Sequence, residues 1–405
     1  MGSQAGAGRR LSVITIDQIV SGASNLLIAL LSAHLLGTAA FGYFGLILVI
    51  YAGAQGVTRS LVGDPLLVHP DDARNRVGAP VSSALVLGVG MGALILALAG
   101  VLHLADLPLA PEMLILGLAF PGLILHDLGR YLGFAVQRPS LSLVLDLTWL
   151  VLSTTAFVAV IALDDISLTW FTLAWVGPGA LASLLVFAQH RIRLGGARAW
   201  LRERWSFSWR YLMSYLATQG AVLGFSVTVA AVAGAFALGA VRGALLLIRP
   251  YMTFQTAAVA AGVSEIANDA DPAAASRHLR RTTVLAMSIG LVNVAVLLLI
   301  PDSVGQLVLA DTWFATEPLL VAASLHILCL GLVAGPRSYL NGTRAIRTTT
   351  TLDIATTFGV VATGTIGVFV DGALGAYWGT AIGQGVAAAI WWTVLGLRRK
   401  RSKMP

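Results

Sequence analysis

Residues 80–103 read PVSSALVLGVGMGALILALAGVLH, a run of 24 residues without Asp, Glu, Lys or Arg. An α-helix rises 1.5 Å per residue, so about 20 apolar residues cross the roughly 30 Å hydrocarbon core of a bilayer. The run is therefore predicted to be a transmembrane helix. Its glycines Gly88, Gly90 and Gly92 are predicted to serve helix packing rather than to bind a dinucleotide.

Similar apolar runs recur along the rest of the chain and predict about twelve transmembrane helices. The whole sequence is 57% hydrophobic and only 11% charged, whereas soluble domains are typically about 25% charged. We therefore predict an all-α integral membrane protein with short connections. Besides 80–103, the predicted spans are residues 12–36, 39–62, 112–136, 141–163, 168–190, 209–233, 236–262, 282–300, 316–340, 350–371 and 373–396.

The charged residues of the predicted loops alternate in sign along the chain. If both termini are cytoplasmic, the inside loops hold the Arg and Lys residues, and the outside turns hold acids instead. This is the positive-inside pattern, and it predicts a multi-pass protein of the bacterial inner (plasma) membrane with cytoplasmic termini. The net charge of +7 follows from this pattern and from contact with anionic membrane lipids, so no nucleic-acid partner is predicted. The outside acids are Asp106, Asp164, Asp165, Asp302, Asp311, Glu317 and Asp371.

An internal repeat relates the two halves of the sequence. Arg130 is followed sixteen residues later by Asp146, and Arg337 is followed sixteen residues later by Asp353. In an antiparallel hairpin each pair lies at one depth, so both are predicted to form intramembrane salt bridges. The alternative is that they form a cytoplasmic gate or a headgroup site.

The repeat predicts two six-helix lobes with the same orientation in the membrane. We place them at residues 1–200 and 206–405, with a central cavity between them. A linker helix at about residues 194–208 combines Trp and Arg residues, a composition typical of a helix at the membrane surface. Rocking of the two lobes would give alternating access, by analogy with other repeat transporters.

Asp17 and Arg59 are each twenty-one residues from the predicted outside turn near residue 38. They are therefore predicted to pair near the cytoplasmic mouth. The second lobe has Gln219 near the equivalent place but no acid. This asymmetry makes Asp17 and Arg59 candidates for ion coupling or gating, with a structural pair as the alternative.

Arg242 and Arg249 lie seven residues apart in one predicted span and share a helical face, with Thr253 four residues further on. An unpaired arginine near mid-bilayer is costly unless it faces a wet cavity. We predict that these three residues line a cationic central cavity and bind substrate. The alternatives are pairing with an acid such as Asp127, or snorkelling by Arg242. Pro250 predicts a kink beside Arg249.

The sequence carries no signature of catalysis or of a cofactor. There is no phosphate-binding G-x-x-x-x-G-K-[ST] loop and no H-E-x-x-H zinc motif. A single cysteine, Cys329, excludes an internal disulfide and a cysteine-based metal cluster. We predict a protein that is not an enzyme, without catalytic residues, a metal site or a cofactor.

The first 67 residues carry a family resemblance. Asp17-Gln18, then Asn25, then residues 33–37 (AHLLG) and 41–43 (FGY) resemble the start of bacterial polysaccharide flippases. Residues 59–67 (RSLVGDPLL) resemble the same proteins. These are the Wzx-like O-antigen and exopolysaccharide flippases of the multidrug/oligosaccharidyl-lipid/polysaccharide (MOP) superfamily, and the resemblance implies its MATE-like fold.

The resemblance implies export of a polyprenyl-diphosphate-linked oligosaccharide to the outer leaflet for polysaccharide biosynthesis. It also implies a polysaccharide polymerase and glycosyltransferases as candidate partners. Arg242 and Arg249 suit a diphosphate, because guanidinium groups bind phosphate oxygens in pairs. The alternatives are an H⁺- or Na⁺-coupled multidrug antiporter of the same superfamily, a major-facilitator carrier, and a membrane scaffold or receptor that transports nothing.

Overall fold

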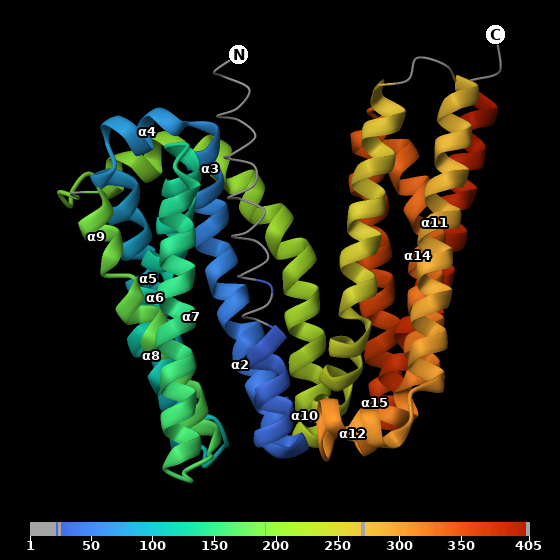
Figure 1. The fold of residues 1–405 in the computed structure, drawn as a ribbon. Coiled ribbons are helices and arrows are strands. Elements are labelled where there is room, and N and C mark those ends of the chain that lie inside the picture. The colour runs from blue at the N-terminus through green and yellow to red at the C-terminus, as the bar shows by residue number, and fades with distance from the viewer. Residues whose placement is uncertain (1–21, 23–25, 191, 269–271, 402–405) are drawn as a thin grey trace. The chain divides into compact units, whose positions relative to one another are not determined.

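The computed structural model describes Gly22 and residues 26–190, 192–268 and 272–401 (Figure 1). Within these ranges the regular structure is helical and no strand occurs. The helices are Leu26–Leu35, α2 (Gly37–Thr58), the π-helix η1 (Arg59–Gly63), α3 (Asp64–Val68), α4 (Pro70–Asn75), α5 (Gly78–Leu104), α6 (Ala110–Ala135), α7 (Pro139–Ala162), α8 (Leu168–Ala182), α9 (Leu185–His190), α10 (Ala197–Asn268), α11 (Pro272–Leu299), α12 (Asp302–Leu309), α13 (Thr312–Thr316), the 3₁₀ helix η2 (Glu317–Leu319), α14 (Leu320–Gly342) and α15 (Ile346–Arg401).

Nine helical stretches in the described residues are long and apolar enough to cross a membrane. Two of them, Gln219–Ala267 and Arg347–Lys400, are each interrupted once and supply two crossings each. Every predicted span from the second to the twelfth overlaps one of these crossings. The first predicted span, residues 12–36, lies mostly outside the described residues. The expected all-α membrane architecture is confirmed.

The two interruptions occur where the backbone takes dihedral angles that suit glycine. Gly234 has φ 85° and ψ 172°, and Gly372 has φ 51° and ψ −128°. Glycine adopts positive φ at little cost because it has no Cβ. Within α10 the non-helical residue is thus Gly234, whereas Pro250, the expected kink site, lies inside the helical run.

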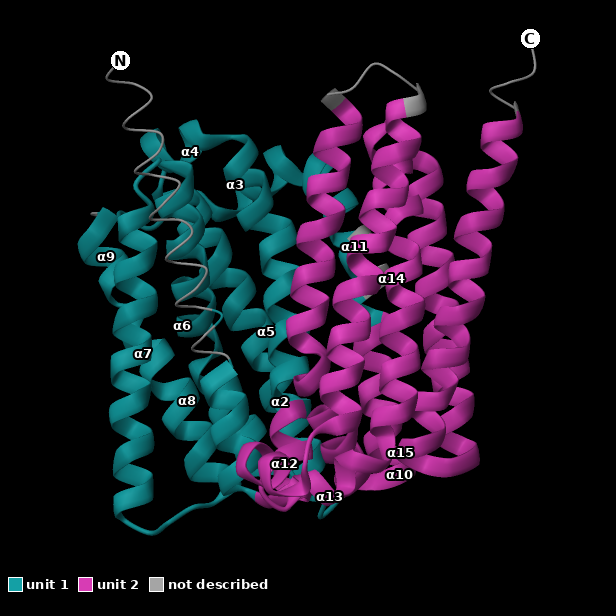
Figure 2. Ribbon diagram, turned by 45° about the vertical axis from the view of Figure 1, so that its right-hand side comes forward, with its two compact units in different colours: residues 1–36, 46–220 teal, residues 37–45, 221–405 magenta. Residues whose placement is uncertain are grey.

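The chain divides into two compact units (Figure 2). Unit 1 comprises Met1–Leu36 and Leu46–Gly220, and unit 2 comprises Gly37–Gly45 and Ala221–Pro405. In unit 1, α6 packs against α5, α7 and α8, and in unit 2, α14 packs against α11 and α15. The chain passes from unit 1 to unit 2 at residue 220, inside α10. The division into lobes at residues 200 and 206, inferred from the repeat, stays a prediction.

A close crossing of two helices explains why the start of α2 belongs to unit 2. A Cβ placed on Gly42 would lie 2.1 Å from the backbone oxygen of Ala235 in α10. A Cβ on Gly239 would lie 2.0 Å from the backbone oxygen of Thr38. The two backbones therefore touch directly, and only glycine permits this approach.

The linker helix expected at about residues 194–208 forms the beginning of α10. This helix starts at Ala197 and continues into the seventh predicted span without a non-helical residue before Gly234. No proline and no positive φ interrupts that run, so nothing separates a linker helix from the span. The first turns of α10 are counted with unit 1.

Candidate functional site

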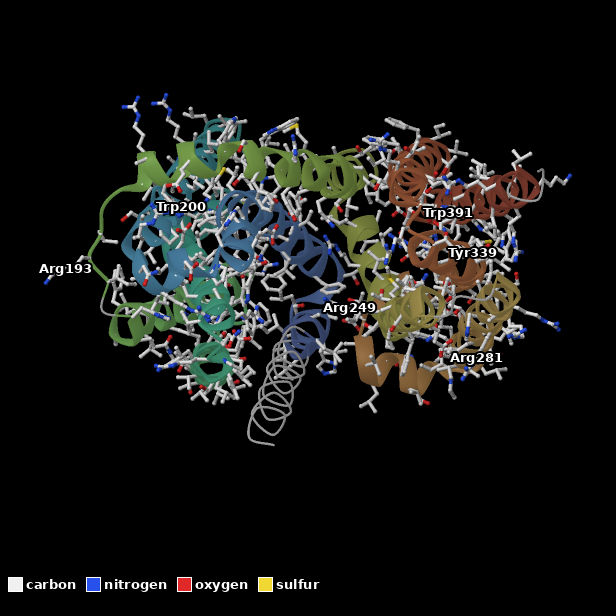
Figure 3. All side chains as sticks on the ribbon, turned by 90° about the horizontal axis from the view of Figure 1, so that it is seen from above. Arg193, Trp200, Arg249, Arg281, Tyr339 and Trp391 are labelled. Atoms are coloured by element: carbon white, nitrogen blue, oxygen red, sulfur yellow. The ribbon has the colours of Figure 1, made fainter. Side chains whose placement is uncertain are left out.

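The predicted cationic residues lie in the second half of α10, in unit 2. Arg249 and Thr253 are exposed, and the Thr253 hydroxyl donates a hydrogen bond of 3.1 Å to the backbone oxygen of Arg249. Among the described residues, no carboxylate forms an ion pair with Arg249. Figure 3 labels this side chain on α10. Arg249 is therefore a guanidinium within a candidate membrane span that no described acid neutralises.

Arg242 is less exposed than Arg249. Its side chain runs across Gly45, where a Cβ would lie 2.9 Å from Nε and 3.0 Å from Cγ and Cδ. The Nη2 atom is buried and has no hydrogen-bond partner among the described residues. Next to it in sequence, the backbone oxygen of Val241 accepts a hydrogen bond of 3.3 Å from the Tyr377 hydroxyl. A buried donor of this kind needs an acceptor, which a bound ligand or water can supply.

Arg242 and Arg249 are two helical turns apart, about 10 Å along the axis. The structure gives them different surroundings, because Gly45 makes room for the first while the second is exposed. Their role as substrate ligands, together with Thr253, stays a prediction.

The repeated arginine–aspartate pairs lie together as their spacing predicted. In unit 1, Arg130 Nε on α6 lies 3.2 Å from Asp146 Oδ2 on α7. In unit 2, Arg337 Nη2 on α14 lies 3.0 Å from Asp353 Oδ2 on α15. Each pair joins the two helices of one hairpin across a short turn.

The pair in unit 1 is more deeply buried and has a histidine beside it. The Asp146 side chain is 7% exposed, whereas that of Asp353 is 30% exposed. His126 Nε2 lies 3.2 Å from the backbone oxygen of Leu145 and 4.0 Å from Asp146 Oδ1. The ring of His126 packs edge-on against Trp149, with the ring centroids 4.8 Å apart. The two pairs are thus alike in sequence spacing but differ in surroundings.

Arg59 pairs with Asp127 on α6. Its Nη2 and Nε atoms donate hydrogen bonds of 2.6 and 2.8 Å to the two carboxylate oxygens of Asp127. The expected partner Asp17 lies outside the described residues. Asp127, which the sequence suggested as a partner for Arg242 or Arg249, is therefore occupied by Arg59.

The backbone around Arg59 departs from a regular α-helix. Residues Arg59–Gly63 form a π-helix, a wider turn that changes the direction of the residues after it. Pro65 has no N–H to bond the backbone oxygen of Leu61, four residues earlier. The Ser208 hydroxyl of α10 donates to that oxygen at 3.2 Å instead. Depth arithmetic for ideal helices could not foresee this turn, which accompanies the Arg59–Asp127 pair.

A polar cluster on the loop between the second and third spans was also missed. Asp72 on α4 is 3% exposed. Its carboxylate accepts hydrogen bonds from Arg76 Nη2 (2.7 Å), Trp200 Nε1 (2.8 Å) and Arg204 Nε (3.0 Å). Glu203 lies 3.2 Å from both Arg76 and Arg204. We call these five residues the Asp72 clasp, and it holds the first turns of α10 on unit 1.

The contacts within the Asp72 clasp lower the pKa of both of its carboxylates, those of Asp72 and Glu203. Burial by itself raises the pKa of Asp72, but the hydrogen bonds from Arg76, Trp200 and Arg204 outweigh it, so the net pKa lies below the usual value. The hydrogen bonds from Arg76 lower the pKa of Glu203. The available sequence signal was an aspartate four residues before Arg76 in this loop, together with the later helix that contains Trp and Arg residues.

Unit 1 also contains an apolar pocket of about 200 Å³ between the helix Leu26–Leu35 and α7. Of its two polar lining residues, Ser153 donates its hydroxyl to the backbone of its own helix. This pocket differs in chemistry from the predicted cationic cavity. It is lined by Leu27, Ile28, Leu31, Leu150, Ser153, Thr154, Phe157, Val158 and Ile161.

In the described part of the chain, no group of three or more His, Cys, Asp or Glu side chains could hold a metal ion.

Comparison with known proteins gives a likeness in structure but none in sequence family. No family model matches the chain, and no curated protein matches its sequence. The structure resembles an inward-facing multidrug resistance MATE family transporter of the MOP superfamily, with a TM-score of 0.72 and 16% identity. The match covers 96% of this chain and 98% of that chain.

Two further solved structures show the same arrangement. The lipid II flippase MurJ, in an inward closed conformation, matches with a TM-score of 0.69 and 12% identity, over 94% of this chain and 87% of that chain. A MATE structure in the bent conformation matches with a TM-score of 0.59 and 17% identity, over 100% and 99% of the two chains. The chain therefore has the all-α membrane fold of these MOP-superfamily proteins.

Proposed function

We propose that the chain is a membrane transporter that carries a polyprenyl-diphosphate-linked oligosaccharide from the cytoplasmic to the outer leaflet of the bacterial inner membrane. The observation that carries the proposal is Arg249, an exposed guanidinium in a membrane span without an ion-pair partner among the described residues. Such a group is costly in a membrane unless it meets an anion or water. The Wzx-like resemblance of residues 17–67 supports the same class of substrate.

A diphosphate matches the chemistry of this helix face. Guanidinium groups present a planar set of donors that bind phosphate oxygens in pairs. The Nη2 atom of Arg242, which is buried and has no hydrogen-bond partner in the described part of the chain, is a second donor on the same face. The lipid II flippase MurJ shares the fold. These features together favour an anionic lipid-linked substrate.

A cation-coupled multidrug antiporter is the second candidate, because the MATE structure with a TM-score of 0.72 is described as a multidrug resistance transporter. An organic cation would be repelled by Arg249, which no described acid neutralises. A coupling acid would be needed as well, and the expected one, Asp17, lies outside the described residues. The charge on the α10 face therefore favours the first candidate.

The test is leaflet exchange in liposomes that contain a fluorescent polyprenyl-diphosphate oligosaccharide. We expect exchange with the native protein, and a loss of about 10-fold or more for Arg249→Ala, since hydrogen bonds to charged groups are worth about 1.5–3 kcal/mol. Arg249→Lys keeps the charge but not the planar set of donors, so we expect intermediate exchange. Arg280→Ala, an exposed arginine of α11, is the matched control and should exchange like the native protein.

Two results would contradict the proposal. If the native protein does not exchange the lipid-linked saccharide but moves a small organic cation in response to a proton or sodium gradient, the antiporter is correct. Exchange that is equal for the native protein and Arg249→Ala would remove Arg249 from the substrate path.

A further inference from the structure

The first turns of α10 have two distinct faces. The inner face carries Trp200, Arg204 and Ser208 at intervals of four residues, and each of them bonds to unit 1 through the Asp72 clasp or the backbone of η1. Trp200 is 1% exposed, and Figure 3 labels it on this helix. These contacts hold the inner face of the first turns against the rest of unit 1.

A stripe of Arg198, Arg202, Trp205, Trp209 and Met213 runs along the outer face. These residues follow one another at intervals of four, three, four and four, so at 100° per residue they fall within a sector of about 80° on one face of the helix. Trp205, Trp209 and Met213 are 54%, 42% and 47% exposed. We call this set the outer stripe.

The charges of the outer stripe are not neutralised within the described structure. Arg198 and Arg202 are exposed and form no ion pair with a described acid. The nearby acid Glu203 is held by Arg76 and Arg204 of the clasp. The outer stripe therefore presents two free guanidinium groups followed by two exposed indole rings.

The order of residues along the outer stripe matches the layers of a bilayer. Counting about 20 residues back from the break at Gly234 places the inner edge of the hydrocarbon core near residue 214. Trp209 then lies about 8 Å before this edge, at the depth of the headgroups, where tryptophan is enriched. Arg202 lies in the turns whose Trp200 and Arg204 contact Asp72, four residues after the candidate span Gly37–Val68 ends, so it lies beside the membrane surface. A cationic residue in this position attracts acidic headgroups.

We propose that the outer stripe is a docking surface for acidic phospholipids of the inner leaflet. Arg198 and Arg202 bind the phosphate groups, while Trp205 and Trp209 pack against the headgroup–glycerol region. The Asp72 clasp holds the stripe toward the lipid. Acidic phospholipid, rather than an acidic protein, is the occupant because the stripe is continuous with a membrane span and contains interface-seeking indoles as well as arginines.

The experiment measures lipid binding to the purified full-length protein in neutral detergent. Phosphatidylglycerol or phosphatidylcholine is titrated, and bound lipid is followed by native mass spectrometry and by the thermal unfolding midpoint. We expect the native protein to prefer phosphatidylglycerol. In the double variant Arg198→Gln, Arg202→Gln this preference should fall by about 30-fold, roughly five-fold per arginine near an anionic surface.

Two further variants separate the stripe from general charge. Arg344→Gln, Arg347→Gln removes the same charge from exposed cytoplasmic residues of unit 2 and should leave the preference unchanged. Trp205→Ala, Trp209→Ala should weaken binding of both lipids. Equal binding of the two lipids by the native protein, or an equal loss in both arginine variants, would overturn the proposal. The assay contains no polyprenyl lipid, so it is independent of the proposed transport.

Discussion

The arginines of this chain differ in whether a carboxylate forms an ion pair with them. Arg59 donates to both oxygens of Asp127, whose side chain is 7% exposed. Arg249 has no such partner among the described residues. A buried pair hides charge from ligands, whereas an unpaired guanidinium offers it. The difference separates residues that hold helices together from residues that are free to bind an anion.

Asp72 is the residue for which a pH dependence is expected. Replacing it by Asn should lower the free energy of unfolding by about 1.5–3 kcal/mol at pH 7, the value of hydrogen bonds to a charged group. Because the pKa of Asp72 in the folded protein lies below the usual value, its stabilisation is complete well above about pH 3.9 and is lost as the pH falls through that value and below it.

Unfolding midpoints in detergent between pH 3 and pH 7 test this expectation. The difference between the unfolding midpoints of the native protein and of Asp72→Asn should become smaller as the pH falls from 7 to 3. Asp71→Asn is the control, because the Asp71 side chain is 81% exposed and lies 3.8 Å from Arg74. If the two unfolding midpoints differ by the same amount at pH 3 and at pH 7, the charge of Asp72 does not stabilise the clasp.

Among the elements, α10 connects the two units. Its first turns are bound to unit 1 by the clasp, by Ser208, and by the Tyr215 hydroxyl, which donates at 2.6 Å to the backbone oxygen of Ala52. Its second half is counted with unit 2 and carries Arg242 and Arg249. One helical run therefore bears both the proposed lipid surface and the proposed substrate residues.

The crossing of α2 and α10 in unit 2 gives a prediction at the scale of elements. Gly42→Ala should destabilise the protein by about 1–3 kcal/mol, the usual effect of overpacking, since its Cβ would lie 2.1 Å from a backbone oxygen that cannot rotate away. A Cβ placed on Gly90 of α5 would have no neighbouring atom within 4 Å, so Gly90→Ala causes no clash. This control should be neutral or stabilising by about 0.5–1 kcal/mol, because alanine favours the helix.

Thermal or denaturant unfolding of both variants in the same detergent provides the comparison. Equal stability of Gly42→Ala and the native protein would mean that the two backbones do not pack as closely as described.

For the whole molecule, the alternation of basic and acidic loops predicts which ends of the helices face the cytoplasm. In a Cys329→Ala background, a cysteine at Asp165 should react with a membrane-impermeant maleimide on intact cells. A cysteine at Arg344 should react only after the cells are opened. Both side chains are exposed in the structure, so burial does not explain a difference. The reverse pattern of labelling would invert the proposed orientation.

The sequence by itself determined the fold class and the position of the spans. Apolar length and loop charge are local properties, so the run at residues 80–103 could be recognised without its neighbours, and α5 occupies Gly78–Leu104. The sixteen-residue spacing also anticipated the meeting of Arg130 with Asp146 and of Arg337 with Asp353. In those cases the partners belong to adjacent helices joined by a short turn.

Only the tertiary structure decided which distant groups meet. Arg59 is 68 residues from Asp127, and Asp72 is 128 residues from Trp200. Depth alone could not choose among acids on several helices, because lateral packing and the π-helical turn at Arg59–Gly63 determine where each side chain points. The glycine at position 45 likewise made room for Arg242 only once α2 and α10 had packed together. Local hydrophobicity therefore specifies the helices, while contacts between helices specify the charges that remain free to bind.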